Sequence, residues 1–392
     1  MAYMLKPTFQ TYAWGDRHYL QQLCNLEEKL GQPMAEMWLG AHPQSPSLLI
    51  SDDGAIALNR FLDTDPQFYL GSAATLYHQQ LPFLLKVLAA EQPLSIQVHP
   101  DKFTAENGFL AENMQGIEMG NSFRTFKDDN HKPELLCALT DFTAMCGFRP
   151  FKQIVSLFSA FSLQLIWPLF AVFADKPDPD TLQELFRQIL DSDLTDLQQF
   201  LACLNRADCS DDADLEFVKT ICLQLNRHHS FDSGIVSPLL LNTFTLKPGQ
   251  AIFLEAGMIH AYIKGAGVEI MANSDNVIRG GLTPKHIDKA KLFAITSFQP
   301  HFPQIIQPEP AVNELVLYST PAEEFALAHL TLKGDYLYQP QNRPAILLCL
   351  AGQGIANEEL EFSQGTAIFV PACESQLILR GSASLYLATS KA

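Results

Sequence analysis

The chain has 392 residues, of which 47% are hydrophobic and 18% are charged. This composition is typical of a large folded protein with two or three domain cores, and it excludes a mainly disordered chain. Asp and Glu number 43 against 26 Lys and Arg, which gives a formal net charge of -17. No run of basic residues offsets this charge locally, so we expect no nucleic-acid partner and no anionic membrane surface.

The eight cysteines are scattered without a C-x-x-C pair, and the first residues show no signal-peptide pattern. Both features indicate a reduced protein in the cytoplasm. The longest apolar stretch, residues 154–173, is interrupted by Pro168 and by polar side chains. A membrane span needs about 20 uninterrupted apolar residues, so we do not expect one here.

The first 150 residues contain short runs of alternating apolar and polar side chains cut by Gly and Pro, a pattern typical of a β-sandwich or β-barrel. In one predicted strand, residues 94–98, the alternation places Ser95, Gln97 and His99 on one face. Donor atoms two residues apart on a strand can reach one metal ion. Taken alone, such a face is more often an ordinary polar strand surface, so further ligands have to come from elsewhere.

A second candidate segment is His131-Lys132-Pro133-Glu134. Pro133 favours an extended backbone at the residue before it, so we expect Lys132 and Glu134 to project in the same direction. The segment therefore offers a carboxylate and an ammonium group to one site.

Residues 151–230 show helical periodicity instead. Apolar residues repeat at i, i+3, i+4, i+7 and i+8: Leu182, Leu185, Phe186, Ile189 and Leu190. Thr181 and Glu184 have the spacing of a capping box, which predicts that a helix begins there. Residues 194–204 and 215–225 predict two more helices. We interpret the segment as a compact helical block.

Strand-like runs return after this block, at residues 244–246 and 251–254. The β segments on its two sides are too short to form a good domain each. We therefore predict one β domain from residues 1–150 and 231–307, with residues 151–230 inserted into it. A further β-rich stretch, residues 308–392, is predicted to form a C-terminal domain.

The two β regions share a weak internal repeat. Residues 246–260 and 362–376 both contain a turn glycine, an Ala-Ile-Phe strand and a following alanine. The first copy ends in x-x-Gly-x-x-His and resembles the second cupin motif, in which the histidine points into a jelly-roll barrel. We therefore expect a mainly β fold with two cupin-like jelly-roll barrels, the first carrying the helical insertion. Gln376 stands in the place of His260, so only the first barrel is expected to bind metal; the alternative is two unrelated hairpins with a common turn.

Four of these residues together form a candidate metal site. Gln97, His99, Glu134 and His260 offer one amide oxygen, two imidazoles and one carboxylate. This set suits a divalent transition metal and leaves a position open for water or substrate. Two histidines and one carboxylate also suit non-haem iron, so the residue types alone leave both zinc and iron open.

The densest polar stretch of the chain, residues 267–285, follows His260. A run rich in turn formers is by default a structural loop. However, Arg279 and Lys285 lie near the predicted metal site in a chain short of positive charge. Together with Lys132 they predict a cationic rim, the expected receptor for a phosphorylated substrate.

Several segments resemble the type I mannose-6-phosphate isomerase (phosphomannose isomerase) family, most closely its enterobacterial members. The motifs that carry the resemblance extend over nearly the whole chain: Tyr12–Gly15, Met34–Pro43, Gln92–Pro100, His131–Glu134 and Met271–Lys285. The last two motifs are specific to this family among cupins. The helical block matches the family's helical domain in place but carries little recognisable sequence.

The resemblance implies an enzyme with one zinc ion per chain that interconverts D-mannose 6-phosphate and D-fructose 6-phosphate through an enediol. Such an enzyme links hexose phosphate metabolism to mannose utilisation and to mannose-derived sugar nucleotides. The resemblance places the zinc ligands at Gln97, His99, Glu134 and His260. It places the catalytic arginine at Arg279 and further substrate contacts at Ser95, Lys132, Glu269 and Lys285. The general base is left open between Glu269 and Lys132.

Two other functions remain as alternatives. An iron-dependent cupin oxygenase would consume oxygen, and a non-enzymatic sugar-phosphate sensor would carry a module that binds DNA or a partner. The helical block is acidic at residues 191–196 and 208–214, which disfavours DNA binding. We expect a small phosphorylated sugar as the ligand, no nucleic acid and no membrane, and a monomer, with an oligomer left open.

Overall fold

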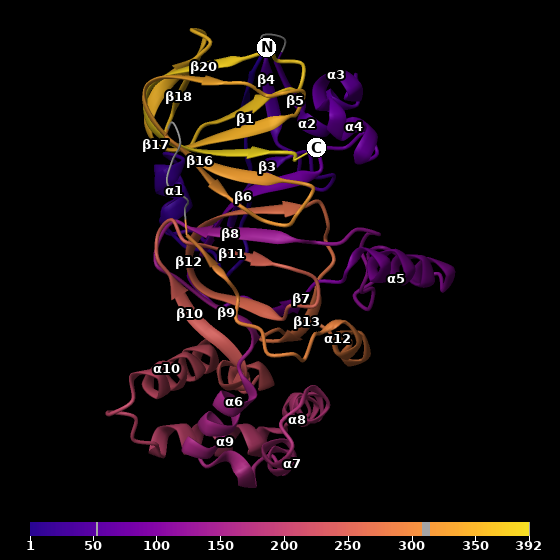
Figure 1. Cartoon of the computed structure of the whole chain (residues 1–392), viewed down its shortest axis with the longest axis vertical. Helices are drawn as coiled ribbons and strands as arrows, with labels where there is room; N and C mark the ends of the chain where they lie inside the picture. Colours follow the sequence, from indigo (N-terminus) through magenta and orange to yellow (C-terminus); the bar gives the residue numbers. More distant parts are fainter. Residues whose placement is uncertain (52–53, 308–313, 392) are drawn as a thin grey trace.

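The computed structural model describes residues 1–51, 54–307 and 314–391. Within these ranges the named strands pair in an antiparallel manner and form two sheets. Most of the longer helices gather at one end of the molecule, and both chain termini lie near the other end (Figure 1). The expected mainly β fold is confirmed.

The larger sheet occupies the middle of the molecule and carries the predicted site segments (Figure 1). Its strands are β2 (Thr8–Gln10), β3 (Glu36–Gly40), β6 (Phe83–Ala90), β7 (Ile96–Val98), β8 (Glu134–Ala138), β9 (Phe142–Phe148), β10 (Leu241–Leu246), β11 (Ala251–Leu254), β12 (His260–Ala272), β13 (Ile278–Gly281) and β14 (Ile305–Ile306). The long strand β12 pairs with β6, β7, β8 and β9, so it brings together segments that are far apart in the sequence.

The second sheet combines C-terminal strands with strands from the start of the chain. Its strands are β1 (Tyr3–Lys6), β4 (Leu48–Ser51), β5 (Gly54–Ala57), β15 (Leu315–Tyr318), β16 (Ala326–Tyr338), β17 (Ala345–Ala356), β18 (Leu360–Ser363), β19 (Ala367–Val370) and β20 (Leu377–Thr389). Strand β1 lies between β19 and β4, and Met4 is opposite both Ile368 and Ile50. The second sheet therefore includes strands from both ends of the chain, and the predicted domain boundaries stay a prediction.

The predicted helical block lies between β9 and β10, which pair with each other. It contains α6 (Phe151–Ala160), η2 (Leu163–Leu165), α7 (Leu169–Asp175), α8 (Pro179–Leu190), α9 (Leu194–Arg206) and α10 (Ala213–His228). Two short helices, η3 (Ser233–Val236) and α11 (Ser237–Leu240), follow the block and lead into β10. The three predicted helices correspond to α8, α9 and α10. The remaining helices are α1 (Tyr19–Leu23), η1 (Glu27–Lys29), α2 (Leu58–Leu62), α3 (Pro66–Leu70), α4 (Ser72–Leu76), α5 (Lys102–Met114) and α12 (Lys289–Ile295).

The start of α8 differs from the predicted capping box. Asp178 is the N-cap residue: its side chain accepts a hydrogen bond from the Thr181 backbone N–H, and Thr181 Oγ1 accepts one from the Asp178 N–H. Pro179 occupies the first turn, where its missing N–H costs nothing. The expected box of Thr181 and Glu184 was therefore wrong, because the better cap lies three residues earlier.

The helical block and the larger sheet share one apolar core. Phe148 of β9 packs edge-on against Phe186 of α8 at 5.9 Å between ring centroids, and it stacks on Phe298 at 5.1 Å. This shared core fixes the position of the block relative to the sheet. Among the described helices, none is both long and apolar enough to cross a membrane.

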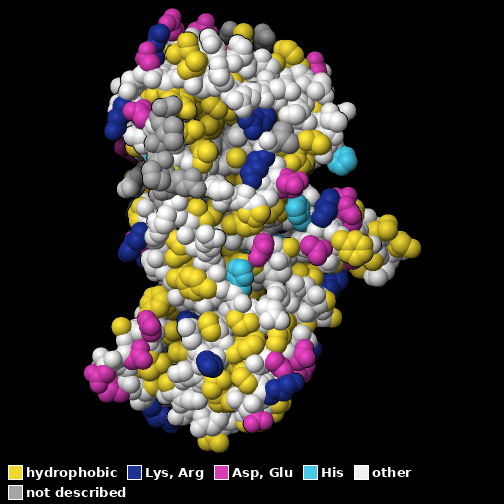
Figure 2. All heavy atoms as spheres, viewed as in Figure 1, with side chains coloured by type: hydrophobic (Ala, Val, Ile, Leu, Met, Phe, Trp, Pro, Cys, Tyr) yellow, Lys and Arg dark blue, Asp and Glu magenta, His cyan; other side chains and the backbone are white. Residues whose placement is uncertain are grey.

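Helix α5 projects from the body of the molecule and carries apolar side chains on its surface (Figure 2). Phe103 is 75% exposed, Leu110 57% and Met114 81%. This helix therefore presents a hydrophobic surface to solvent.

The internal repeat has similar backbone geometry in both copies. The turn glycines Gly249 and Gly365 have φ angles of 88° and 82°, and each precedes a strand, β11 or β19. The copies differ at the last position, where His260 is buried and Gln376 is exposed. The metal-free state of the second copy stays a prediction.

Candidate metal centre and substrate cleft

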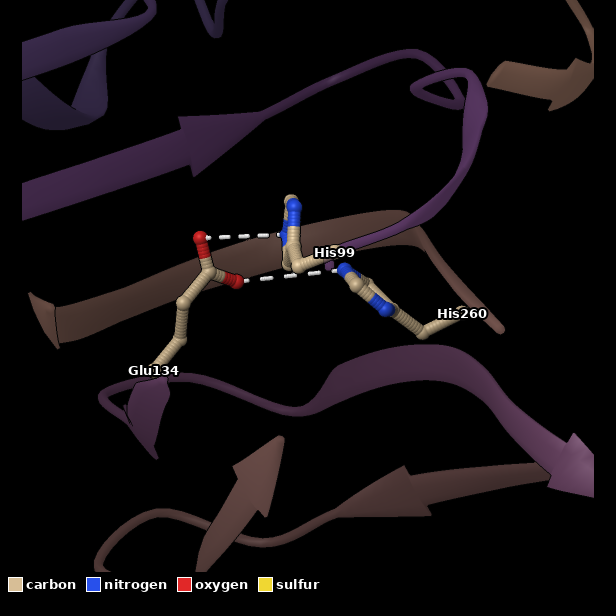
Figure 3. A group of neighbouring side chains, drawn as sticks. All are labelled: His99, Glu134 and His260. Atoms are coloured by element: carbon tan, nitrogen blue, oxygen red, sulfur yellow. Dashed lines mark ion pairs between the residues drawn. The ribbon is translucent and has the colours of Figure 1, made fainter. Parts of the chain in front are cut away.

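Three of the predicted metal ligands meet at a buried point of the larger sheet (Figure 3). His99 follows β7, Glu134 begins β8 and His260 begins β12, and one ligand atom from each lies within 4.8 Å of the others. Glu134 Oε1 lies 3.5 Å from His99 Nε2, and Glu134 Oε2 lies 3.8 Å from His260 Nε2. His99 is 1% exposed and the other two residues are 3% exposed.

Both imidazoles are oriented as metal ligands. His99 Nδ1 lies 2.7 Å from the backbone oxygen of Asn276, and His260 Nδ1 lies 2.9 Å from that of Met258. A proton donated from Nδ1 leaves Nε2 with a free lone pair that faces Glu134. His99 Nε2 is buried without a hydrogen-bond partner among the described residues, and a bound ion explains such an atom. The three side chains therefore fit a divalent transition metal.

The electrostatics of the cluster favour the protonation states that bind metal. Burial acts to raise the pKa of Glu134, but the nearby Lys132, His99 and His260 outweigh it and hold the pKa well below the usual range. Burial, reinforced by His99, lowers the pKa of His260 to about 4. At neutral pH the carboxyl group is ionised and the imidazole of His260 is neutral.

Gln97 lies between two site residues in the sheet. It is directly opposite His260 on β12 and Arg279 on β13. Residues directly opposite one another in antiparallel strands project from the same face, so these three side chains share one face. The role of Gln97 as a fourth ligand stays a prediction.

A cleft of about 500 Å³ opens at the metal cluster, a volume typical of small-molecule sites. The residues predicted to surround the substrate all line it: Ser95, Lys132, Glu269, Arg279 and Lys285. The structure thus brings together in one cleft side chains that are up to 190 positions apart in the sequence.

The three cations of the predicted rim have different environments. Lys132 Nζ lies 2.9 Å from Glu134 Oε1, so this cation belongs to the metal cluster. Burial lowers the pKa of Arg279, while the charge of Arg279, followed by burial, lowers the pKa of Lys285. Within the described part of the chain, no carboxylate forms an ion pair with Arg279 or Lys285. These two cations repel each other and are available to bind an anion.

A buried charged network that was not predicted from the sequence lies beside the cluster. Lys86 Nζ lies 3.1 Å from Glu269 Oε2 and 3.6 Å from Glu36 Oε1, and the Tyr262 hydroxyl donates to Glu269 Oε1 at 3.0 Å. All four side chains line the cleft. Burial raises the pKa of Glu269, although Lys86 opposes the shift. The available signal was Lys86 itself, the single charge in the otherwise apolar strand Phe83–Ala90, because a buried lysine needs partners.

The loop between β12 and β13 supports the metal site directly. The Asn276 side chain accepts from the Lys127 N–H at 2.7 Å and donates to the Asn130 carbonyl at 2.8 Å, while its backbone oxygen holds His99. The loop therefore ties the segment that leads to Glu134 to the histidine that follows β7.

A buried pair of histidines with one carboxylate, at the base of a cleft that presents two unpaired cations, defines a candidate metalloenzyme for a small anionic substrate. Comparison with known proteins agrees with this class. A family model for the catalytic domain of phosphomannose isomerase type I matches residues 2–151.

Relatives and solved structures match nearly the whole chain. The mannose-6-phosphate isomerase of Escherichia coli (strain K12) is 41% identical over 382 residues, which cover 96% of each chain. A substituted phosphomannose isomerase from Salmonella typhimurium has a TM-score of 0.92 at 36% identity and covers 100% of both chains. A zinc-bound mannose 6-phosphate isomerase has a TM-score of 0.90 at 35% identity and the same coverage. The chain belongs to the type I phosphomannose isomerase family.

Proposed function

We propose that this chain is a zinc-dependent isomerase that interconverts D-mannose 6-phosphate and D-fructose 6-phosphate through an enediol. The observation that carries the proposal is the buried cluster of His99, Glu134 and His260 at the cleft that Arg279 and Lys285 line. The names of the relatives support the substrate, and the zinc-bound structure supports the metal.

The proposal extends to the architecture around the site. The cleft belongs to the first of two cupin-like jelly-roll barrels, into which the helical block is inserted, and the chain acts as a monomer. Its eight cysteines, all free, are consistent with the reducing conditions of the cytoplasm.

His99, Glu134, His260 and Gln97 would hold the zinc ion. Zinc supplies a Lewis acid that polarises oxygen atoms of the sugar when it is bound. Each histidine keeps its orientation through its Nδ1 contact with a backbone oxygen, so the two Nε2 atoms and the carboxylate converge without rearrangement.

Glu269 is assigned as the general base that moves a proton between C2 and C1 of the sugar. Its carboxylate lines the cleft, and burial raises its pKa towards the range that suits a general base at neutral pH. Tyr262 and Lys86 hold the carboxylate in place by hydrogen bonds at 3.0 and 3.1 Å. Lys132 is less suited to this role because its ammonium group donates to Glu134.

Arg279 is assigned to the negative charge that develops on the carbonyl oxygen during the reaction. It lies opposite Gln97 in the sheet, which places it beside the predicted metal ligands. A positioned guanidinium group stabilises such a charge with two donors in a fixed plane. Lys285, in the loop that follows β13, is assigned to the substrate phosphate, and Ser95 and Lys132 to the sugar.

A coupled assay tests the proposal. Purified protein with zinc should convert mannose 6-phosphate to fructose 6-phosphate without consuming oxygen. Oxygen uptake with bound iron would instead support the oxygenase, and binding of the sugar phosphate without turnover would support a sensor.

A further inference from the structure

The helical block leads into residues 231–236, which lie against the loop that carries Lys285. The side chain of Asp232 accepts three backbone hydrogen bonds in this region. Oδ1 accepts from the N–H of Gly234 at 2.7 Å and of Leu282 at 2.8 Å, and Oδ2 accepts from the N–H of Thr283 at 3.1 Å. Two of these bonds therefore connect the end of the helical block to the cleft loop.

A further hydrogen bond links the residues held by Asp232 to Lys285. Thr283 Oγ1 accepts from the backbone N–H of Lys285 at 3.1 Å. Leu282, Thr283 and Lys285 all line the cleft, whereas Asp232 is not among the described residues that line it. Asp232 thus acts on the cleft through the backbone of its neighbours.

The backbone at Gly234 also packs closely against the backbone at residues 281–282. A Cβ atom on Gly234 would lie 2.8 Å from the Leu282 nitrogen, and one on Gly281 would lie 3.0 Å from Gly234 Cα. Leu282 has a φ of 53°, a left-handed conformation that is strained for a residue with a side chain. Strain of this kind persists where the surroundings enforce it, and the hydrogen bond from Leu282 to Asp232 is such a restraint.

We propose that Asp232 is a positioning residue for the substrate phosphate. By fixing Leu282 and Thr283, it keeps Lys285 in position to bind the phosphate. The inference rests on the proposed function, which assigns the phosphate to Lys285. The competing role for Asp232 is purely structural, as the N-cap of η3.

The test compares the wild-type chain with Asp232→Ala and Asp232→Asn. The control is Asp193→Ala, because Asp193 caps α9 in the same helical block and also accepts two backbone hydrogen bonds, from Thr195 and Asp196. The measurements are KM and kcat for mannose 6-phosphate, the inhibition constant of inorganic phosphate, and zinc content.

Asp232→Ala should raise both KM and the inhibition constant of phosphate by about tenfold, with kcat changed by less than about twofold. Zinc content should stay normal. Asp232→Asn keeps one acceptor oxygen but turns an NH₂ group towards one of the backbone N–H donors. Its KM should therefore lie between that of the wild type and that of Asp232→Ala. Asp193→Ala should leave KM unchanged.

A normal KM and a normal inhibition constant in Asp232→Ala, with only the thermal stability lowered, would overturn the inference. Should that variant fail to fold, Asp232→Asn decides: an unchanged KM in folded Asp232→Asn would equally contradict it. A wild-type chain that does not isomerise mannose 6-phosphate would overturn the proposed function instead. Calorimetric binding of inorganic phosphate to the wild type and Asp232→Asn would then still decide the role of Asp232.

Discussion

At the scale of single residues, His260 is the most direct test of the metal site. Its Nε2 faces Glu134, while its Nδ1 contacts a backbone oxygen. In His260→Ala we expect zinc and activity to be lost together, since a zinc site with one ligand fewer binds weakly. The fold should survive because the larger sheet retains its apolar core. Metal analysis and circular dichroism measure both effects.

His229→Ala is the matched control for that variant. His229 lines the same cleft, but its Nε2 contacts the backbone oxygen of Pro93 and it lies outside the metal cluster. The control should keep its zinc. Full zinc occupancy in His260→Ala would remove His260 from the ligand set.

Arg279→Lys separates charge stabilisation from substrate anchoring. Lysine keeps the positive charge but lacks the planar pair of donors, so we expect kcat to fall by a factor of at least about 10² with normal zinc content. Steady-state kinetics on the zinc-loaded protein provide the measurement. A variant with a raised KM and a nearly normal kcat would show that Arg279 only anchors the phosphate.

Local patterns predicted the cluster because each ligand belongs to a short motif. His99 follows an alternating strand, Glu134 follows a proline and His260 ends a turn pattern, so no long-range information was required. Lys86 was missed because it is the single charge in an apolar strand, and Tyr262 because its neighbours in the sequence do not indicate a partner for its hydroxyl. The function of each appears only when Glu269 is placed beside it. Pairing across strands supplies that information.

At the scale of elements, substitutions at the start of α8 test whether Asp178 is its N-cap. Asp178→Ala removes the acceptor for the Thr181 N–H and should weaken the first turn of α8 by about 1 kcal/mol. Hydrogen exchange of a peptide that covers residues 178–184 should become faster in this variant. Glu184→Ala is the control and should exchange like the wild type. Faster exchange in Glu184→Ala, with wild-type exchange in Asp178→Ala, would instead support the capping box of Thr181 and Glu184.

At the scale of the whole molecule, one ion pair joins the C-terminal region to the segment that leads to the metal site. His131 Nε2 lies 2.5 Å from Glu324 Oε1. Burial acts to raise the pKa of Glu324, but His131 and backbone N–H groups outweigh it and lower the pKa below the ordinary 4.5. A lowered carboxyl pKa stabilises the fold above the unfolded-state value, and this stability is lost as the pH falls through the folded-state value.

Glu324→Gln should therefore lower the unfolding temperature by about 2 °C at pH 6, and the difference from the wild type should disappear once the pH falls below the lowered folded-state pKa of Glu324. Calorimetry at a series of pH values measures the difference. Glu323→Gln is the neighbouring control, because its backbone oxygen accepts from the Tyr77 hydroxyl without using the carboxylate. A difference that persists unchanged at low pH would contradict the electrostatic explanation.

The assembly of the two sheets was beyond prediction from local pattern. Strand β1 pairs with β4 and also with β19, which lies more than 300 residues later in the chain. The helical block was predictable because its periodicity is local and its apolar faces are continuous over several turns. Global sheet order depends on contacts that no short segment encodes.

The measurement that tests the central claim most directly is zinc reconstitution with activity followed in the same sample. Protein stripped by a chelator should be inactive, and isomerisation of mannose 6-phosphate should return in proportion to added zinc up to one ion per chain. His260→Ala, treated in the same way, should regain neither zinc nor activity. Full isomerase activity in the zinc-free wild-type protein, or recovery with ferrous iron alone and oxygen uptake, would contradict the account.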